Sequence, residues 1–166
     1  VSVAVLWIWV RRSSPSRQLR LSADIVAISM IAEALIGAGL VLFELVGENE
    51  SVVRAASGAI HLANTFLLLS SLFVTGWLAS TGKKIKFEGR RSVILQLGIG
   101  AIGLVLIGSS GAIAALGDTL YPAETLGQGI AAEFHSSAPF LVQLRTAHPI
   151  IAVIVAALIL IFTRDT

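Results

Sequence analysis

The sequence predicts an all-α fold, a polytopic transmembrane helix bundle with four complete spans and a partial first helix. Of the 166 residues, 55% are hydrophobic and 13% are charged, whereas about a quarter of a soluble domain is charged. The apolar residues also form blocks long enough to cross a hydrocarbon layer, which takes about 20 helical residues. Because lipid cannot satisfy backbone N–H and C=O groups, these blocks are predicted to be helices.

Four blocks reach this length. The predicted spans are residues 21–46, 54–80, 92–117 and 139–163. Residues 1–10 are equally apolar but too short to span, and Arg11 and Arg12 follow at once. A signal peptide has its positive charge before the apolar region. We therefore expect residues 1–10 to end a helix, and the chain to be a fragment of a longer protein in which residues 1–166 form one transmembrane domain.

Basic residues are concentrated in the loops on one predicted side of the membrane. These ten residues are Arg11, Arg12, Arg17, Arg20, Lys83, Lys84, Lys86, Arg90, Arg91 and Arg164. The opposite side has only two basic residues, Arg54 and Arg145, and it carries acidic loops. Basic loops remain cytoplasmic, so we expect a multi-pass protein of the inner (cytoplasmic) cell membrane. The positive charge is then explained by topology, and no nucleic-acid partner is expected.

The loops differ in length. Residues 47–50 are predicted to be a tight outer turn and residues 80–89 a short inner loop. The longest loop, residues 118–138, lies outside, and the four-residue spacing of Ile130 and Phe134 predicts a short helix on the membrane surface. The chain has no cysteine, which excludes disulfides, cysteine-ligated zinc and iron–sulfur clusters.

Two histidines lie within the spans, where ionisable groups are costly and usually functional. His61 is seven residues past Arg54, or about 10 Å deep, and His148 is about 13 Å deep in the last span. A helix that began at Pro149 would be too short to cross the membrane. Pro149 is therefore predicted to lie inside the span, where it leaves a carbonyl without its donor.

Each histidine shares a helix face with an arginine nearer the outer surface. Arg54 precedes His61 by nearly two turns, and Arg145 precedes His148 by three residues. A neutral imidazole can ligate heme iron, and an arginine can pair with a heme propionate. The candidate heme-binding residues are therefore these four, with His61 and His148 as the iron ligands.

Several alternatives remain open. A metal-bound imidazole needs a partner for its second nitrogen, and Ser57 or Thr65 could supply it for His61. Each histidine could instead bond a neighbouring helix, with the arginines as interfacial anchors. Glu33 could relay protons or be a protonated carboxyl bonded across a helix interface, and the role of His135 is open. The Gly-x-Gly-x-x-Gly pattern at 98–103 lies inside a span without a preceding strand, so it is not a dinucleotide site.

Two longer motifs resemble the heme A synthase family. They are Gly-Asp-Thr-Leu-Tyr-Pro at 117–122 and Leu-Arg-Thr-Ala-His-Pro at 144–149, and shorter matching words occur at 34–38, 59–62 and 108–112. The resemblance covers essentially the whole chain. It implies an eight-helix bundle of two similar four-helix halves, each holding a heme between two histidines, with residues 1–10 ending the second helix.

On this resemblance, His61 is one ligand of the first-half heme, where substrate heme O is oxidised, and His148 is one ligand of the second-half heme b. The family's partner histidines and its helix-two glutamate are absent from this chain. The outer-loop cysteines of some members are absent too, which puts a disulfide-linked mechanism in doubt. The family is a heme-dependent oxidoreductase that converts a methyl group of heme O to a formyl group for terminal oxidase assembly.

Two other classes of function are compatible with the same residues. The chain could belong to a diheme b-type electron-transfer subunit with no substrate chemistry, or to a non-catalytic helical subunit of a respiratory or photosynthetic complex. Expected partners are the lipid bilayer, heme, and other membrane subunits or a second copy of the chain.

Overall fold

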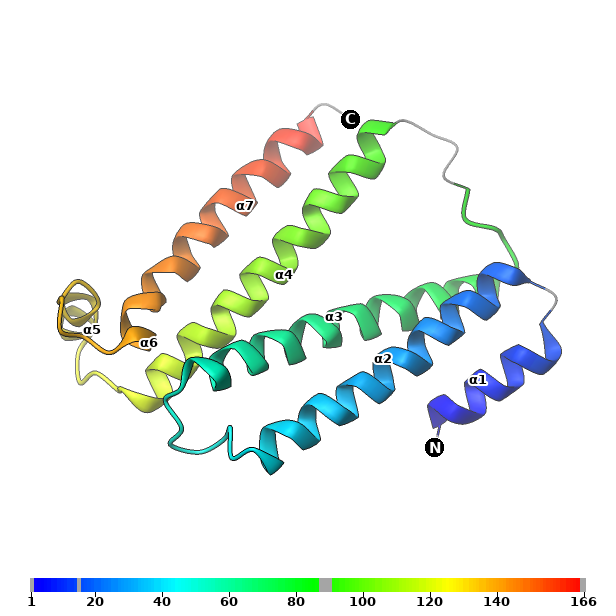
Figure 1. The fold of residues 1–166 in the computed structure, drawn as a ribbon. Helices are drawn as coiled ribbons and strands as arrows, with labels where there is room; N and C mark the ends of the chain where they lie inside the picture. The colour runs from blue at the N-terminus through cyan, green and yellow to red at the C-terminus, as the bar shows by residue number, and fades with distance from the viewer. Residues whose placement is uncertain (1, 15, 87–90, 165–166) are drawn as a thin grey trace.

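The helices form two groups that meet near one end. The computed structural model describes residues 2–14, 16–86 and 91–164, and this part of the chain contains helices and no strand. The helices are α1 (Ser2–Ser13), α2 (Arg17–Leu42), α3 (Val52–Thr81), α4 (Arg91–Leu120), α5 (Leu126–Glu133), α6 (Phe140–Gln143) and α7 (Ala147–Arg164). In Figure 1, α1 to α3 lie side by side, and α4 pairs with α7; α3 contacts α4 where α3 begins and α4 ends.

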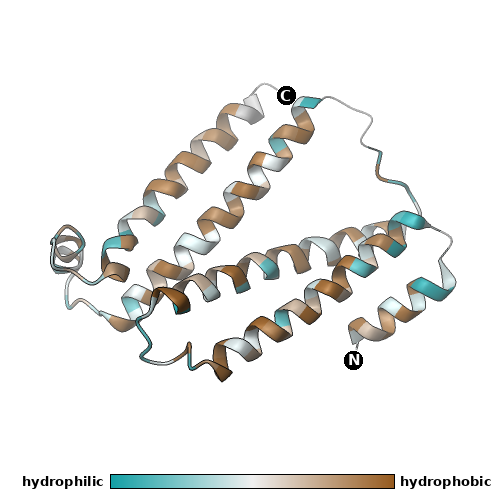
Figure 2. Ribbon diagram, viewed as in Figure 1, coloured by the Kyte–Doolittle hydropathy of each residue, from teal (hydrophilic) through white to brown (hydrophobic). Residues whose placement is uncertain are grey.

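Among the described residues, four segments are long and apolar enough to cross a membrane, which confirms the predicted all-α polytopic fold. They are Arg17–Leu42, Val52–Thr81, Arg91–Leu120 and Phe140–Ile161. Most of their side chains are not enclosed by the chain itself, and Figure 2 shows hydrophobic residues along the length of these helices. Such outward-facing apolar surface suits contact with lipid acyl chains.

The first complete span lies four residues earlier than expected, at Arg17–Leu42 rather than 21–46. Ser16 caps the helix, because its hydroxyl accepts a hydrogen bond from the Leu19 N–H. At the other end, Glu44 adopts a positive φ of 54° and turns the chain away. The outer turn therefore begins before Gly47, where the sequence had placed it.

The last span has an irregular start. A 3₁₀ turn, Leu144–Thr146, joins α6 to α7, and the three together form the span. Pro149 lies three residues beyond this turn and has no N–H to donate to the Arg145 carbonyl. A 3₁₀ turn tightens the backbone at such a break. The span begins before Pro149, as predicted, and the break lies directly beside His148.

The predicted short helix in the long outer loop is present as α5. Thr125 caps it by accepting a hydrogen bond from the Gln128 N–H. Its placement on the membrane surface stays a prediction.

The inner loop is anchored to α2 by a side chain. The Gln18 amide donates to the Ile85 carbonyl, at 2.8 Å, and accepts from the Ile85 N–H, at 2.9 Å.

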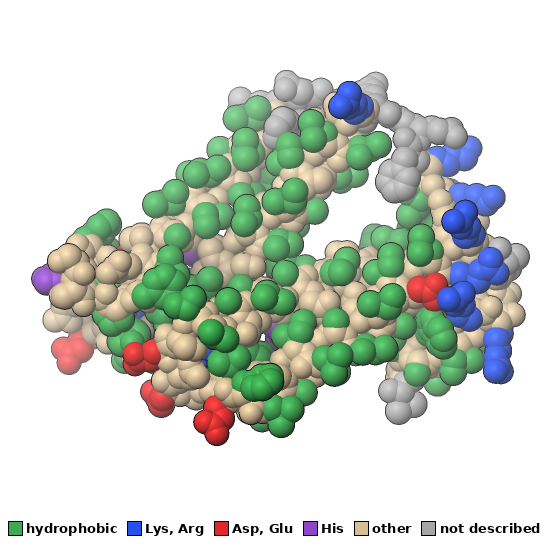
Figure 3. Space-filling view, in the orientation of Figure 1, with side chains coloured by type: hydrophobic (Ala, Val, Ile, Leu, Met, Phe, Trp, Pro, Cys, Tyr) green, Lys and Arg blue, Asp and Glu red, His purple; other side chains and the backbone are tan. Residues whose placement is uncertain are grey.

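Charged side chains are segregated to the two ends of the bundle. In Figure 3, lysines and arginines gather at the end where α1 finishes and α2 begins, and most acidic side chains lie at the opposite end. Asp24 is an acid near the basic end, where its Oδ1 pairs with Arg11 Nε at 2.9 Å and accepts from Trp7 Nε1 at 2.8 Å. Arg90 lies outside the described residues, as does the side chain of Arg164. Which end faces the cytoplasm stays a prediction.

Candidate functional site

His61 of α3 lies against α2. Its Nε2 is 3.6 Å from Glu33 Oε1, and both side chains are partly buried. The ring passes close to Gly37, where a Cβ atom would lie 3.7 Å from His61 Cε1. Its Nδ1 is buried, and the described residues offer it no hydrogen-bond partner.

Glu33 is bonded across the α2–α3 interface. The Asn64 amide donates to Glu33 Oε2 and also to the Ser29 carbonyl at 2.9 Å. The Thr65 hydroxyl donates to Glu33 Oε1 and lies 3.0 Å from the His61 carbonyl. Cross-interface bonding was one of the two roles left open for Glu33. Of the two residues that could have bonded the second nitrogen of His61, neither Ser57 nor Thr65 does so, and the Thr65 hydroxyl contacts Glu33 and a backbone carbonyl instead.

His148 of α7 lies against α4 in a different setting. Its Nδ1 is 3.1 Å from Ser110 Oγ, and that hydroxyl also donates to the Ile107 carbonyl at 3.1 Å. Because a hydroxyl has one hydrogen, Ser110 then accepts from an N–H at Nδ1. This leaves the lone pair on Nε2, for which the described residues supply no hydrogen-bond partner. Gly111 makes room for the ring, since a Cβ there would be 3.1 Å from His148 Cε1.

Both arginines bind backbone carbonyls: Arg54 in the turn that follows α2, and Arg145 at the end of α4. Arg54 donates to the carbonyls of Gly47 and Asn49, the second at 2.8 Å. Carbonyls at and beyond a helix C-terminus lack intrahelical donors. Arg54 therefore fixes the turn between α2 and α3.

Arg145 does the same for α4. It is 8% exposed, and its Nη2 donates to the carbonyls of Gly117 at 2.5 Å and Tyr121 at 2.6 Å. Its Nε lies 3.1 Å from Asp118 Oδ1, but the two are not aligned as a hydrogen bond. The sequence did not predict this capping role. Pairing of Arg54 or Arg145 with a heme propionate stays a prediction.

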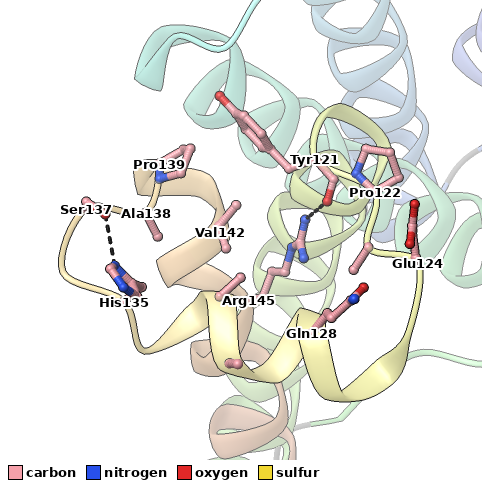
Figure 4. A pocket seen from close by; sticks show the side chains of 13 residues that line it. Tyr121, Pro122, Glu124, Gln128, His135, Ser137, Ala138, Pro139, Val142 and Arg145 are labelled. Carbon is pink, nitrogen blue, oxygen red and sulfur yellow. Dashed lines mark hydrogen bonds between the residues drawn. The ribbon is translucent and has the colours of Figure 1, made fainter.

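An open pocket of about 550 Å³ is lined by the segment that follows α4, by α5 and by α6 with the residues next to it (Figure 4). Its wall includes Gln128, His135 and Arg145, and His135 Nδ1 lies 2.9 Å from Ser137 Oγ. Tyr121, also in this wall, has a raised pKa because its phenol hydrogen-bonds the Glu50 carboxylate. Because His135 lines this pocket and contacts Ser137, it belongs to the loop between α5 and α6 and not to the sites in the spans.

The two histidines of the spans do not converge on one site. His61 belongs to the α2–α3 pair and His148 to the α4–α7 pair, and the described residues contain no cluster of three metal-ligating side chains. His148 fits a heme ligand, because Ser110 holds one ring nitrogen and the other is free. At His61, Nε2 lies 3.6 Å from the Glu33 carboxylate, beyond hydrogen-bond distance, and Nδ1 is buried without a partner among the described residues, so neither nitrogen orients the ring as Ser110 does at His148.

Comparison with known proteins identifies a family for this chain. The model of the COX15-CtaA family, described as cytochrome oxidase assembly proteins, matches residues 1–165. Proteins from two strains of Thermus thermophilus, both named protoheme IX farnesyltransferase, are 39% identical over 154 residues, which is 92% of this chain. The chain spans 25% of the length of each of these relatives. No solved structure matches. This family match confirms the resemblance to heme A synthases, and the chain belongs to the COX15-CtaA family of cytochrome oxidase assembly proteins.

Proposed function

We propose that this chain is the heme-binding membrane part of a heme A synthase, which oxidises a methyl group of heme O to a formyl group for terminal oxidase assembly. The observation that carries the proposal is the setting of His148. Its Nδ1 is held by Ser110, its Nε2 is free, and Gly111 gives the ring space. A metal-ligating histidine is oriented through its second nitrogen in this way.

In this proposal His148 ligates a heme b, and Ser110 fixes the direction of the ring. His61 ligates the heme O that is oxidised, and the surrounding apolar spans keep water away from it. The bound heme supplies the oxidative chemistry, and the protein binds and orients it. We place the protein in the inner (cytoplasmic) membrane, with its basic loops in the cytoplasm.

The Thermus relatives support a function in heme metabolism. Their name refers to protoheme IX. Because this chain matches only a quarter of their length, farnesyl transfer is not assigned to it. The shared region is the part that the cytochrome oxidase assembly model also matches.

The test replaces each histidine by alanine in the full-length protein purified from membranes. His61→Ala should abolish conversion of heme O, and His148→Ala should mainly deplete bound heme b. Heme is identified by pyridine hemochrome spectra and mass spectrometry. His135→Ala is the matched control, because this histidine lies in the outer loop and should leave both hemes in place.

Other outcomes select other functions. Two hemes bound without any conversion of heme O would indicate the diheme electron-transfer subunit. Wild-type protein without heme would overturn the proposal and leave the non-catalytic helical subunit in its place.

A further inference from the structure

The outer pocket, which α5, α6 and the segment after α4 line (Figure 4), is separate from the two histidine sites of the spans. Neither His61 nor His148 is part of its wall. Its volume of about 550 Å³ lies within the range of small-molecule sites, about 300–1,000 Å³. Many of the lining side chains are small and apolar: Ala123, Ala131, Ala132, Ala138, Pro139 and Val142. Such a wall leaves room for a flat apolar ring.

The charged side chains around the outer pocket balance one another. Arg145 and Glu124 both line the wall, and Asp118 Oδ1 lies 3.1 Å from Arg145 Nε. Arg145 is also committed to the protein, because its Nη2 donates to two backbone carbonyls. An anion therefore gains little attraction in this pocket, and a cation would lie against a buried guanidinium. The charges favour a neutral ligand.

Two neutral side chains of the wall, Gln128 and His135, can bond such a ligand. His135 Nδ1 lies 2.9 Å from Ser137 Oγ. When the Ser137 hydroxyl donates to Nδ1, the ring hydrogen is on Nε2, which can then donate to a ligand. The described residues supply no partner for this Nε2 or for the side-chain amide of Gln128. In Figure 4 the two side chains lie on opposite sides of Arg145, so a ligand with oxygens on opposite edges of a ring can meet both.

The helix that forms one side of the outer pocket has an exposed apolar face. No residue of α5 is buried, and the bulky side chains of Leu126, Ile130 and Phe134 are 82%, 49% and 76% exposed. A short helix with such a face suits the boundary between lipid and water. On the predicted placement of α5 at the membrane surface, a lipid-soluble ligand reaches the pocket beside this helix. The α5 residues that line the pocket are small or polar: Gln128, Ala131 and Ala132.

We propose that the outer pocket binds a lipid-soluble quinone, with its ring between the small apolar side chains and its two carbonyl oxygens at Gln128 and His135. A quinone is neutral, its ring is flat and apolar, and its oxygens accept hydrogen bonds. The reduced form, a quinol, donates hydrogen bonds instead. The side-chain carbonyl of Gln128 and the carboxylate of Glu124, both in the wall, can accept them. The pocket therefore suits both forms of the ligand.

The test titrates the full-length protein in detergent with a photoreactive azidobenzoquinone that carries a short alkyl tail, and the labelled peptides are quantified by mass spectrometry. The label should fall within residues 121–145 and be displaced by unlabelled decylubiquinone. Gln128→Leu and His135→Leu should each weaken binding by about 2- to 10-fold, because each removes one hydrogen bond. Ala131→Trp should fill the pocket and abolish labelling. Ile130→Trp is the matched control and should leave labelling unchanged, because this neighbouring side chain of α5 does not line the pocket.

Three outcomes would overturn the proposal. The first is equal labelling of the wild type and Ala131→Trp, or labelling that lies outside residues 121–145. The second is displacement of the label by phospholipid but not by decylubiquinone, which would assign the pocket to a lipid. The third is loss of heme from Gln128→Leu or His135→Leu, which would make the pocket part of a heme site. Heme content is measured on the same samples and should be unchanged in all four variants, so this inference and the proposed function fail on different readouts.

Discussion

Replacing Gly111 by alanine should disturb the heme binding that we propose for His148. The new Cβ would lie 3.1 Å from His148 Cε1 and 3.4 Å from Nδ1, so the ring must move by a few tenths of an ångström. This shift weakens the 3.1 Å contact between Nδ1 and Ser110. A lost hydrogen bond of this type costs about 0.5–1.5 kcal/mol, which corresponds to roughly 2- to 10-fold weaker heme binding.

The net loss of stability should be about 0–2 kcal/mol, because two effects partly cancel. Alanine is better than glycine within a helix by about 1 kcal/mol, and overpacking costs about 1–3 kcal/mol. Hemin titration and thermal unfolding in detergent measure the two quantities separately. Gly37→Ala is the matched control, since its Cβ would be 3.7 Å from His61 Cε1, an ordinary contact. Equal loss of heme in both variants, or no loss in Gly111→Ala, would refute the reasoning.

Three further predictions follow from the described contacts. Gly103→Ala should destabilise the α4–α7 pair by about 1–3 kcal/mol, because its Cβ would lie 2.5 Å from Val155 Cγ1, and adding Val155→Ala should restore the unfolding temperature. Glu50→Gln should lower the pKa of Tyr121, which ultraviolet titration of tyrosinate measures. Because the Tyr121 pKa is raised in the folded protein, the contact with Glu50 stabilises the fold fully below the unfolded phenol pKa of about 10. This stabilisation is lost as the pH rises through the pKa of folded Tyr121. Cysteines replacing Lys84 and placed in α5 should be labelled from opposite sides of the membrane, and labelling from one side would contradict the topology.

The sequence could predict the helices because their signal is local. Hydrophobic length alone identified each span, and the charge pattern agrees with the separated charges of Figure 3. The error of four residues in α2 arose because Ser16 is a helix cap that hydropathy does not detect. Similarly, the 3₁₀ turn before His148 is invisible to hydropathy, although Pro149 indicated a break in this helix.

The candidate site could be predicted only in part. The histidines stand out in the sequence because ionisable groups are rare in spans. Their partners do not: Glu33 is 28 residues from His61, and Ser110 is 38 from His148. Such pairs depend on how neighbouring helices are rotated, which the sequence of one helix does not determine. The helix-face argument placed the arginines above the histidines, but it could not reveal that Arg145 is taken up by carbonyls of α4.

The two histidine sites differ in the space around the ring and in its polar neighbour. A Cβ on Gly111 would lie 3.1 Å from His148 Cε1, so that ring needs the glycine, whereas a Cβ on Gly37 would make an ordinary 3.7 Å contact with His61. Ser110 lies at hydrogen-bond distance from His148 Nδ1, whereas the Glu33 carboxylate lies 3.6 Å from His61 Nε2 and accepts from Asn64 and Thr65. Since both differences lie directly at the ring, a difference between the two sites in the proposed heme binding should come largely from them.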